Sequence, residues 1–122
     1  MKKSLLSAAA IVAAIAMPGS LALAQTNEIT IGISISTTGP AAALGIPERN
    51  ALDFVPKEIG GVPLKLIVLD DGGDPTNATT NARRFVTESK ADIIMGSSTT
   101  PPTVAVSTVA NEAGIPDRKS VV

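Results

Sequence analysis

The sequence predicts an α/β fold in which a doubly wound parallel sheet carries helices on both faces. Three segments rich in β-branched and aliphatic residues, at 28–35, 62–70 and 91–95, alternate with segments of helical periodicity. The second of these strands is almost continuously apolar toward its end, as expected for a strand covered on both faces. An alternation of this kind, β-α-β-α-β-α, is typical of parallel sheets whose strands are joined by helical crossovers.

The first helix is predicted over residues 46–59. Pro47 suits the first turn of such a helix, whereas Pro56 removes a hydrogen bond from its interior, so we expect a kink or early fraying there. The pair Gly60-Gly61 is expected to end this helix. Its inward face is expected to carry Leu52, Val55 and Ile59.

The second and third helices have clearer start signals. Asp74 is a good N-cap and Pro75 a good first residue, and we expect the helix that they begin to run to about Ser89. The third helix is predicted from Pro102 to Glu112, ended by the Ala-Gly pair that follows. The residues of the second helix that are expected to face the core are Ala78, Ala82, Phe85 and Val86.

The N-terminal segment 1–24 has the pattern of a secretory signal peptide. Lys2 and Lys3 precede an apolar stretch, and Ala22-Leu23-Ala24 is a small-residue cleavage signal. The apolar stretch is shorter than the ~20 residues that a membrane-spanning helix needs. We therefore expect export to the periplasm and a mature domain that begins at residue 25.

The C-terminal segment 117–122, DRKSVV, differs in character from the residues before it. Ile115-Pro116 is expected to start a fourth strand, and the polar tail is not expected to continue it. All six tail residues match the translation of a common sequencing adapter, whose next codon is a stop. We therefore interpret 25–116 as part of an N-terminal lobe and 117–122 as an adapter-derived tail.

The composition excludes several classes of function. The chain has 122 residues and contains no Cys or His, so catalytic triads and thiol chemistry are excluded. Loss of Lys2 and Lys3 with the leader lowers the formal net charge from −1 to −3, which argues against nucleic acid as a partner. We expect no enzymatic activity and no cofactor.

Two hydroxyl-rich loops, at 36–45 and 96–101, follow the first and third predicted strands. If the strands lie in the order 2-1-3, both loops reach the switch point where ligands bind in such sheets. Thr99 and Thr100 stand at the start of the third helix, where unpaired N–H groups attract anions. Because Pro101 and Pro102 have no N–H, the donors left for an anion are the hydroxyls and the N–H groups of Thr99, Thr100 and Thr103.

An acidic cluster, Asp70-Asp71-Gly-Gly-Asp74, raises the alternative of a metal or acid–base site. The spacing of a calcium loop is incomplete, because no Glu stands at its closing position. Asp74 is explained more simply as a helix cap. We therefore expect no metal site.

Four features in this order resemble the N-terminal part of type I periplasmic binding proteins. They are STTGP at 36–40, GG at 60–61, DDxxDP at 70–75, and IIxGSSTT at 93–100 followed by AGIP at 113–116. The branch that they resemble includes the branched-chain amino acid and amide receptors of ABC transporters. The resemblance implies an exported subunit that binds a small molecule and delivers it to an ABC permease.

The resemblance also implies five ligand-binding residues, Thr38, Gly39, Leu44, Thr99 and Thr100. Thr100 falls at the family's hydroxyl position for a ligand carboxylate, with Thr99 beside it. Leu44 stands where the family often has an aromatic wall, and this departure leaves the identity of the ligand open. The family closes two lobes around its ligand, so we expect a partial lobe to bind nothing tightly.

Two other functions remain open at this point. A ligand-sensing domain of a receptor or regulator would share the same first lobe. An enzyme of flavodoxin-like topology would use Asp70 and Asp71 for metal-dependent chemistry, and a cleaved leader counts against it.

Overall fold

The structure, a computed structural model, describes residues 27–118. Its sheet contains β1 (Ile29–Ile35), β2 (Glu58–Ile59), β3 (Val62–Asp70), β4 (Ile93–Met95) and β5 (Asp117–Arg118). The strands lie in the order β2-β3-β1-β4-β5, and every pair is parallel except β2 with β3. The expected order, with the first strand between the second and third predicted strands, is confirmed.

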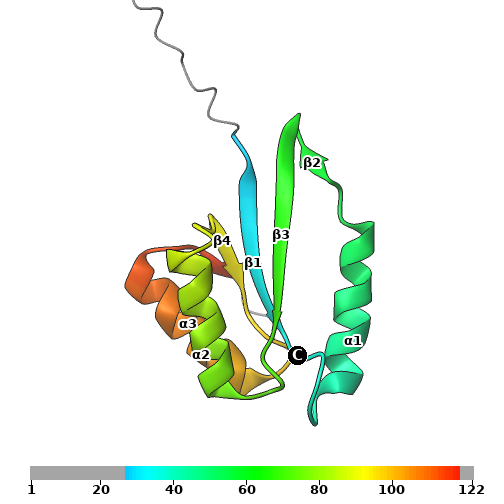
Figure 1. The fold of residues 1–122 in the computed structure, drawn as a ribbon, viewed down its shortest axis with the longest axis vertical. Coiled ribbons are helices and arrows are strands. Elements are labelled where there is room, and N and C mark those ends of the chain that lie inside the picture. The colour runs from blue at the N-terminus through cyan, green and yellow to red at the C-terminus, as the bar shows by residue number, and fades with distance from the viewer. Residues whose placement is uncertain (1–26, 119–122) are drawn as a thin grey trace, which may run out of the picture.

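Three α-helices cover the sheet. They are α1 (Ala42–Ala51), α2 (Pro75–Thr87) and α3 (Thr100–Ala113). Figure 1 shows α2 and α3 side by side on one face of the sheet and α1 on the other. The predicted doubly wound α/β class is therefore correct. Among residues 27–118, no helix is long and apolar enough to cross a bilayer.

The core lies between the sheet and the pair α2–α3. Phe85 is its largest fully buried side chain, and its ring packs over Gly32 of β1, where an added Cβ would lie 2.4 Å from the ring. The inward face predicted for the second helix is correct, because three of its four residues are fully buried and Val86 packs against them. The buried core residues are Ala78, Ala82, Phe85, Ala91, Ile94, Val106, Val109 and Ala110.

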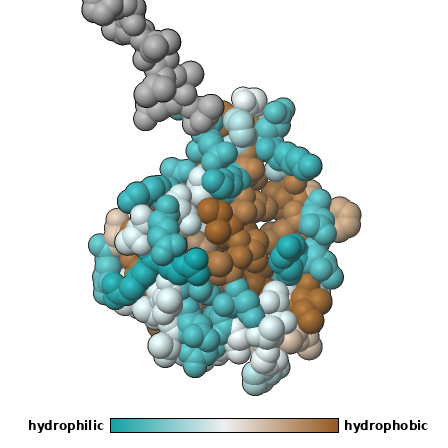
Figure 2. All heavy atoms as spheres, viewed as in Figure 1, coloured by the Kyte–Doolittle hydropathy of each residue, from teal (hydrophilic) through white to brown (hydrophobic). Residues whose placement is uncertain are grey.

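The opposite face of the sheet is covered by α1 alone and is apolar. Ile33 and Ile35 of β1 and Met95 of β4 line a cavity of about 230 Å³ together with residues at the end of α1. Figure 2 shows hydrophobic residues gathered around a hollow near the centre of the molecule, with hydrophilic residues around them.

The first helix differs from its prediction over 46–59. It begins at Ala42 and ends at Ala51, followed by a short 3-10 turn at Leu52–Phe54. Pro47 therefore lies inside the helix rather than in its first turn. Val55 is extended (φ −70°, ψ 133°) because a residue before proline avoids the helical region, and this ends the helical path before Pro56.

The predicted end of that helix is a β-hairpin instead. Gly60 and Gly61 have φ of +58° and +80° and join β2 to β3 as a two-residue turn. Consecutive positive φ values are the geometry of a tight hairpin turn, which Gly-Gly adopts without steric cost. Ile59 consequently pairs with Val62 as part of β2 and is exposed, rather than lying on a buried helix face.

The C-terminal end also differs from expectation. The last strand is formed by Asp117–Arg118 instead of starting at Ile115-Pro116, so the first two residues of the polar tail do continue the sheet. An edge strand pairs through its backbone, and the Asp117 carboxylate accepts a hydrogen bond from the Ser107 hydroxyl at 2.6 Å. The predicted adapter origin of 117–122 remains a prediction, and residues 119–122 and the predicted signal peptide lie outside the described residues.

The N-cap of α2 and the C-cap of α3 agree with the sequence. The Asp74 side chain accepts hydrogen bonds from the N–H groups of Thr76 (2.7 Å) and Asn77 (3.0 Å), as an N-cap does. These two bonds lower the pKa of the Asp74 carboxyl. At the other end of the domain, Gly114 ends α3 in the left-handed conformation, at φ +67°.

Candidate functional site

Three strand-to-helix loops meet at the carboxyl ends of β1, β3 and β4. Between them lies an open cavity of about 390 Å³. Three of its lining residues follow β1, one follows β3 and two follow β4. They are Pro40, Ala41, Leu44, Gly73, Thr99 and Pro101. β1 lies between the other two strands, so the strand order reverses here. Ligands of open doubly wound sheets bind beyond the carboxyl ends of the strands at such a switch point.

Two of the five predicted ligand residues, Leu44 and Thr99, line the cavity. Leu44 is 51% exposed although it is large and apolar, so its side chain is free to contact a ligand. Thr38 and Gly39 lie in the same loop as Pro40 but do not line the cavity. Thr100 is exposed at the start of α3, next to Thr99.

At the start of α3, the hydroxyl of Thr99 is not used for capping. Thr99 is the N-cap residue, yet its side chain makes no capping hydrogen bond. The hydroxyl of Thr103 accepts from the Ser97 N–H at 3.1 Å and lies 2.7 Å from the Thr99 carbonyl oxygen, to which it donates. The Thr103 N–H also bonds this carbonyl, at 3.1 Å, so the expectation that Thr103 donates to an anion is wrong.

The loop after β1 is held by Asp70. One carboxylate oxygen of Asp70 accepts from the N–H groups of Thr37 (2.8 Å) and Thr38 (3.2 Å). It also accepts from the Gly72 N–H at 3.0 Å, while the Thr38 hydroxyl donates to the other oxygen. The Thr38 hydroxyl is therefore engaged within the protein, and its predicted role as a ligand contact remains a prediction.

Gly39 brings two loops together. It has φ +72°, and a Cβ added to it would lie 2.4 Å from the carbonyl oxygen of Gly72. No other residue type fits this approach without moving one of the loops. The structure thus gives Gly39 a packing role between the loops after β1 and β3.

The hydrogen bonds to Asp70 affect its ionisation. Burial raises its pKa, but the Thr38 hydroxyl and three backbone N–H groups outweigh burial and lower the pKa of Asp70 from 3.8 to about 2. A carboxyl with a lower pKa in the folded than in the unfolded state stabilises the fold above about pH 4. That contribution is lost as the pH falls toward about 2.

We expect Asp70→Asn to reduce the free energy of unfolding near neutral pH and to matter less near pH 2. The reduction should be about 1 kcal/mol or less, because solvent screens this exposed carboxylate. Urea unfolding of both proteins at the two pH values measures the difference. Asp53→Asn, at a side chain that is 78% exposed, is the matched control for loss of one surface charge. An equal effect of Asp70→Asn at both pH values would contradict this account.

Sequence reasoning missed the contribution of the loop after β3. Gly73 lines the cavity, and the residues before it hold the loop after β1 in place. The available signal was the predicted strand order, because an order of 2-1-3 places both the second and the third strand beside the first. The acidic cluster thus has roles in capping and in loop contacts, and no group of three or more potential metal ligands occurs within residues 27–118.

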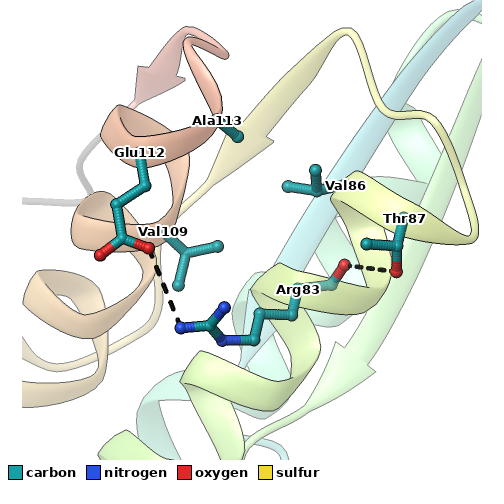
Figure 3. Close-up of a pocket in the computed structure, with 6 residues that line it drawn as sticks. All are labelled: Arg83, Val86, Thr87, Val109, Glu112 and Ala113. Carbon is teal, nitrogen blue, oxygen red and sulfur yellow. Dashed lines mark hydrogen bonds and ion pairs between the residues drawn. The ribbon is translucent and has the colours of Figure 1, made fainter.

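A smaller pocket lies far from the carboxyl ends of the strands. It has a volume of about 170 Å³ and lies between α2 and α3 near their C-terminal ends. Figure 3 shows Arg83 of α2 reaching toward Glu112 of α3, with 3.8 Å between the charged groups. Both side chains are mostly exposed, so this ion pair adds little to stability. The pocket lies at the end of the sheet opposite the candidate site.

The family of the protein follows from comparison of its sequence. The sequence profile of the periplasmic binding protein family matches residues 28–118, which contain the whole sheet and all three loops of the cavity. The chain belongs to the periplasmic binding protein family. This membership confirms the resemblance drawn from the motifs, and it agrees with the expectation that the protein is not an enzyme. No curated protein sequence matches the chain.

Two solved structures from Rhodopseudomonas palustris share the fold. A protein from Rhodopseudomonas palustris strain CGA009 is 77% identical with a TM-score of 0.72, and the match covers 79% of this chain and 28% of that one. An extracellular ligand-binding receptor from Rhodopseudomonas palustris HaA2 is 81% identical with a TM-score of 0.75, over 76% of this chain and 26% of that one.

A more distant structure shows the fold alone. The branched-chain amino acid transporter substrate-binding protein LivJ of Streptococcus pneumoniae, in complex with isoleucine, is 24% identical with a TM-score of 0.66. The match covers 75% of this chain and 28% of LivJ. The chain thus spans 26–28% of the length of these three proteins.

Proposed function

We propose that this chain is the first part of an extracytoplasmic solute-binding protein that serves an ABC importer, with a periplasmic location. The observation that supports it is the cavity at the carboxyl ends of β1, β3 and β4, where Leu44 and Thr99 face the same space. Family membership supports the same assignment, since periplasmic binding proteins bind small molecules. In this proposal the partners are the ligand and an ABC permease.

The lining of the cavity suggests the class of ligand. None of the six lining side chains is charged, and Thr99 alone carries a polar group. The start of α3 has a partial positive charge, to which Thr99 adds a free hydroxyl, so a ligand carboxylate is favoured there. Leu44, Pro40 and Pro101 offer apolar surface to the rest of the ligand. A branched-chain amino acid, an amide or a similar small carboxylate fits this description.

The same lining implies that the site is incomplete. An amino acid also carries a positive amino group, which needs an anionic or hydrogen-bonding partner when it is removed from water. No carboxylate lines the cavity. In the proposed mechanism a second lobe supplies that partner and closes over the ligand by hinge motion.

A chimera tests the proposal. Residues 28–116 of this chain would replace the matching segment of the Rhodopseudomonas palustris CGA009 protein, which is 77% identical and supplies the remaining fold. We expect calorimetry to show binding of a small carboxylate by the chimera but no tight binding by the present chain. The panel includes isoleucine, leucine, small amides and 4-methylpentanoate, which is leucine without its amino group.

Thr99→Val in the chimera tests the carboxylate contact. Removing one hydroxyl of this kind should weaken binding by roughly tenfold, because a hydrogen bond to a charged group contributes about 1.5 kcal/mol or more. Thr108→Val makes the same chemical change on the exposed side of α3, where the hydroxyl bonds the Val104 carbonyl, and should leave affinity unchanged.

Three results would count against the proposal in different ways. Failure of the chimera to bind any carboxylate would refute the ligand class. A larger effect of Thr100→Val than of Thr99→Val would move the contact to Thr100, the position that the family resemblance indicated. Micromolar binding by the present chain would show that the second lobe is unnecessary.

A further inference from the structure

Asp71 is a fully buried carboxylate at the end of β3. One of its oxygens accepts from the Ser36 hydroxyl at 2.7 Å and from the Gly73 N–H at 2.9 Å. The other oxygen accepts from the Ser34 hydroxyl at 2.6 Å. Within residues 27–118 the ion pairs do not include Asp71, so hydrogen bonds alone compensate the removal of this group from water.

The hydrogen bonds continue from Asp71 to the loop after β4. The Ser36 hydroxyl lies 3.1 Å from the Ser97 hydroxyl, and both side chains are buried. The Ser36 N–H donates to the Ser98 hydroxyl at 3.2 Å, and that hydroxyl donates to Glu48 of α1. A continuous set of buried polar contacts therefore joins the loops that follow β1, β3 and β4.

These are the three loops that form the walls of the candidate cavity. Each wall residue lies within a few positions of a member of the set. Leu44 stands one residue before Gly45, whose backbone packs on Ser36. The N–H of Gly73 donates directly to Asp71. Thr99 immediately follows Ser98 in the chain. Asp70, by contrast, connects the loops after β1 and β3 only, from the exposed side.

We infer that Asp71 is a positioning residue of the ligand site, which holds all three loops in the arrangement that forms the cavity. Its hydrogen bonds go to no lining side chain, and it acts through Ser36 and the Gly73 backbone. A buried carboxylate suits this role because it accepts several hydrogen bonds at once, and each bond to a charged acceptor is stronger than one between neutral groups. The functional part of this inference rests on the proposed function, whereas the connection between the loops does not.

Amide hydrogen exchange of the full chain tests the connection without a ligand. The N–H groups of Ser36 and Ser97 bond to Ser98 and Thr103, so neither contacts Asp71. In Asp71→Ala we expect both to exchange at least about tenfold faster, together with Gly73, relative to the Phe85 amide of α2. Acceleration at Gly73 alone, or equal acceleration at Phe85, would overturn the inference.

Two further variants keep the test decisive if Asp71→Ala folds poorly. Asp71→Asn retains one acceptor oxygen for Ser36 and Gly73, and its amide can donate to the Ser34 hydroxyl, so we expect it to restore most of the protection. Ser36→Ala keeps the carboxylate but removes the link to Ser97. It should accelerate exchange at Ser97 and leave Gly73 within about threefold of the original chain, since the Gly73 bond remains. Unchanged exchange at Ser97 would contradict the inference.

The chimera described above tests the functional part. At temperatures well below unfolding, Asp71→Ala should weaken ligand binding by at least about tenfold and Asp71→Asn by less. A lower melting temperature with unchanged affinity would mean that Asp71 is structural only, and would overturn the positioning role. If the chimera with Asp71 intact binds no ligand, the proposed function fails, while hydrogen exchange still decides whether Asp71 holds the loops.

Discussion

Phe85→Ala is expected to lower the free energy of unfolding by about 3–5 kcal/mol, the range measured when a buried phenylalanine is truncated. Phe85 is fully buried and is the largest side chain in the core between the sheet and α2–α3. Its ring lies directly over Gly32, so truncation leaves a cavity above a residue that has no side chain to fill it. Because native domains have a stability of roughly 5–15 kcal/mol, this loss is a large fraction of the total.

Urea unfolding followed by circular dichroism measures this loss. The matched control is Phe54→Ala, which removes the same atoms from a side chain that is 89% exposed and should change stability by less than about 0.5 kcal/mol. These are the two aromatic residues in the sequence, so fluorescence offers no alternative signal from tryptophan. Similar losses in the two variants would show that the core does not lie where the structure places it.

Gly45→Ala is expected to destabilise the protein by about 2 kcal/mol, although alanine is the better helix former. Helix propensity alone predicts a gain of about 1 kcal/mol at this position in α1. A Cβ at Gly45, however, would lie 2.0 Å from the carbonyl oxygen of Ser36. A backbone atom cannot rotate away as a side chain does, so α1 must move off the end of β1, and overpacking of this kind costs about 1–3 kcal/mol.

The same displacement should affect the candidate site, because Leu44 is adjacent to Gly45 and lines the cavity. Unfolding measurements on Gly45→Ala and on Asn50→Ala give the contrast. Asn50 is an exposed residue of the same helix, and its replacement should stabilise α1 by up to about 0.5 kcal/mol. Stabilisation by both variants would mean that α1 does not pack against Ser36 as described.

Elements with strong local signals were predictable from the sequence. The second helix has an Asp cap, a proline at its first position and a regular apolar face, and the structure places all three as expected. The first helix had weaker signals. A Gly-Gly pair that ends a helix cannot be told from one that turns a hairpin until its partner strand is known, and Ile59 was misplaced for that reason.

The candidate site was predictable in part. The hydroxyl-rich loops and the strand order indicated that the loops after the first and third strands would meet, and the family resemblance implied Leu44 and Thr99. The structure brings these two residues into one cavity. The strand order also implied that the loop after β3, which contains Gly73, would lie at the cavity. Sequence reasoning overlooked this. The engagement of the Thr38 hydroxyl by Asp70 and of Thr103 by the Thr99 carbonyl depends on three-dimensional distances and could not be read from spacing.

By itself, the sequence determined the α/β class, the Asp74 and Gly114 caps and the family, because these depend on periodicity and on residues close together in the chain. Only the tertiary structure decided which polar groups are occupied and which remain free for a ligand. The contacts responsible join residues far apart in sequence, such as Ser36 with Asp71 over 35 positions and Ser36 with Ser98 over 62. Hydrogen bonds of that kind form only after the sheet has brought the strand ends together, so they cannot be predicted from local sequence patterns.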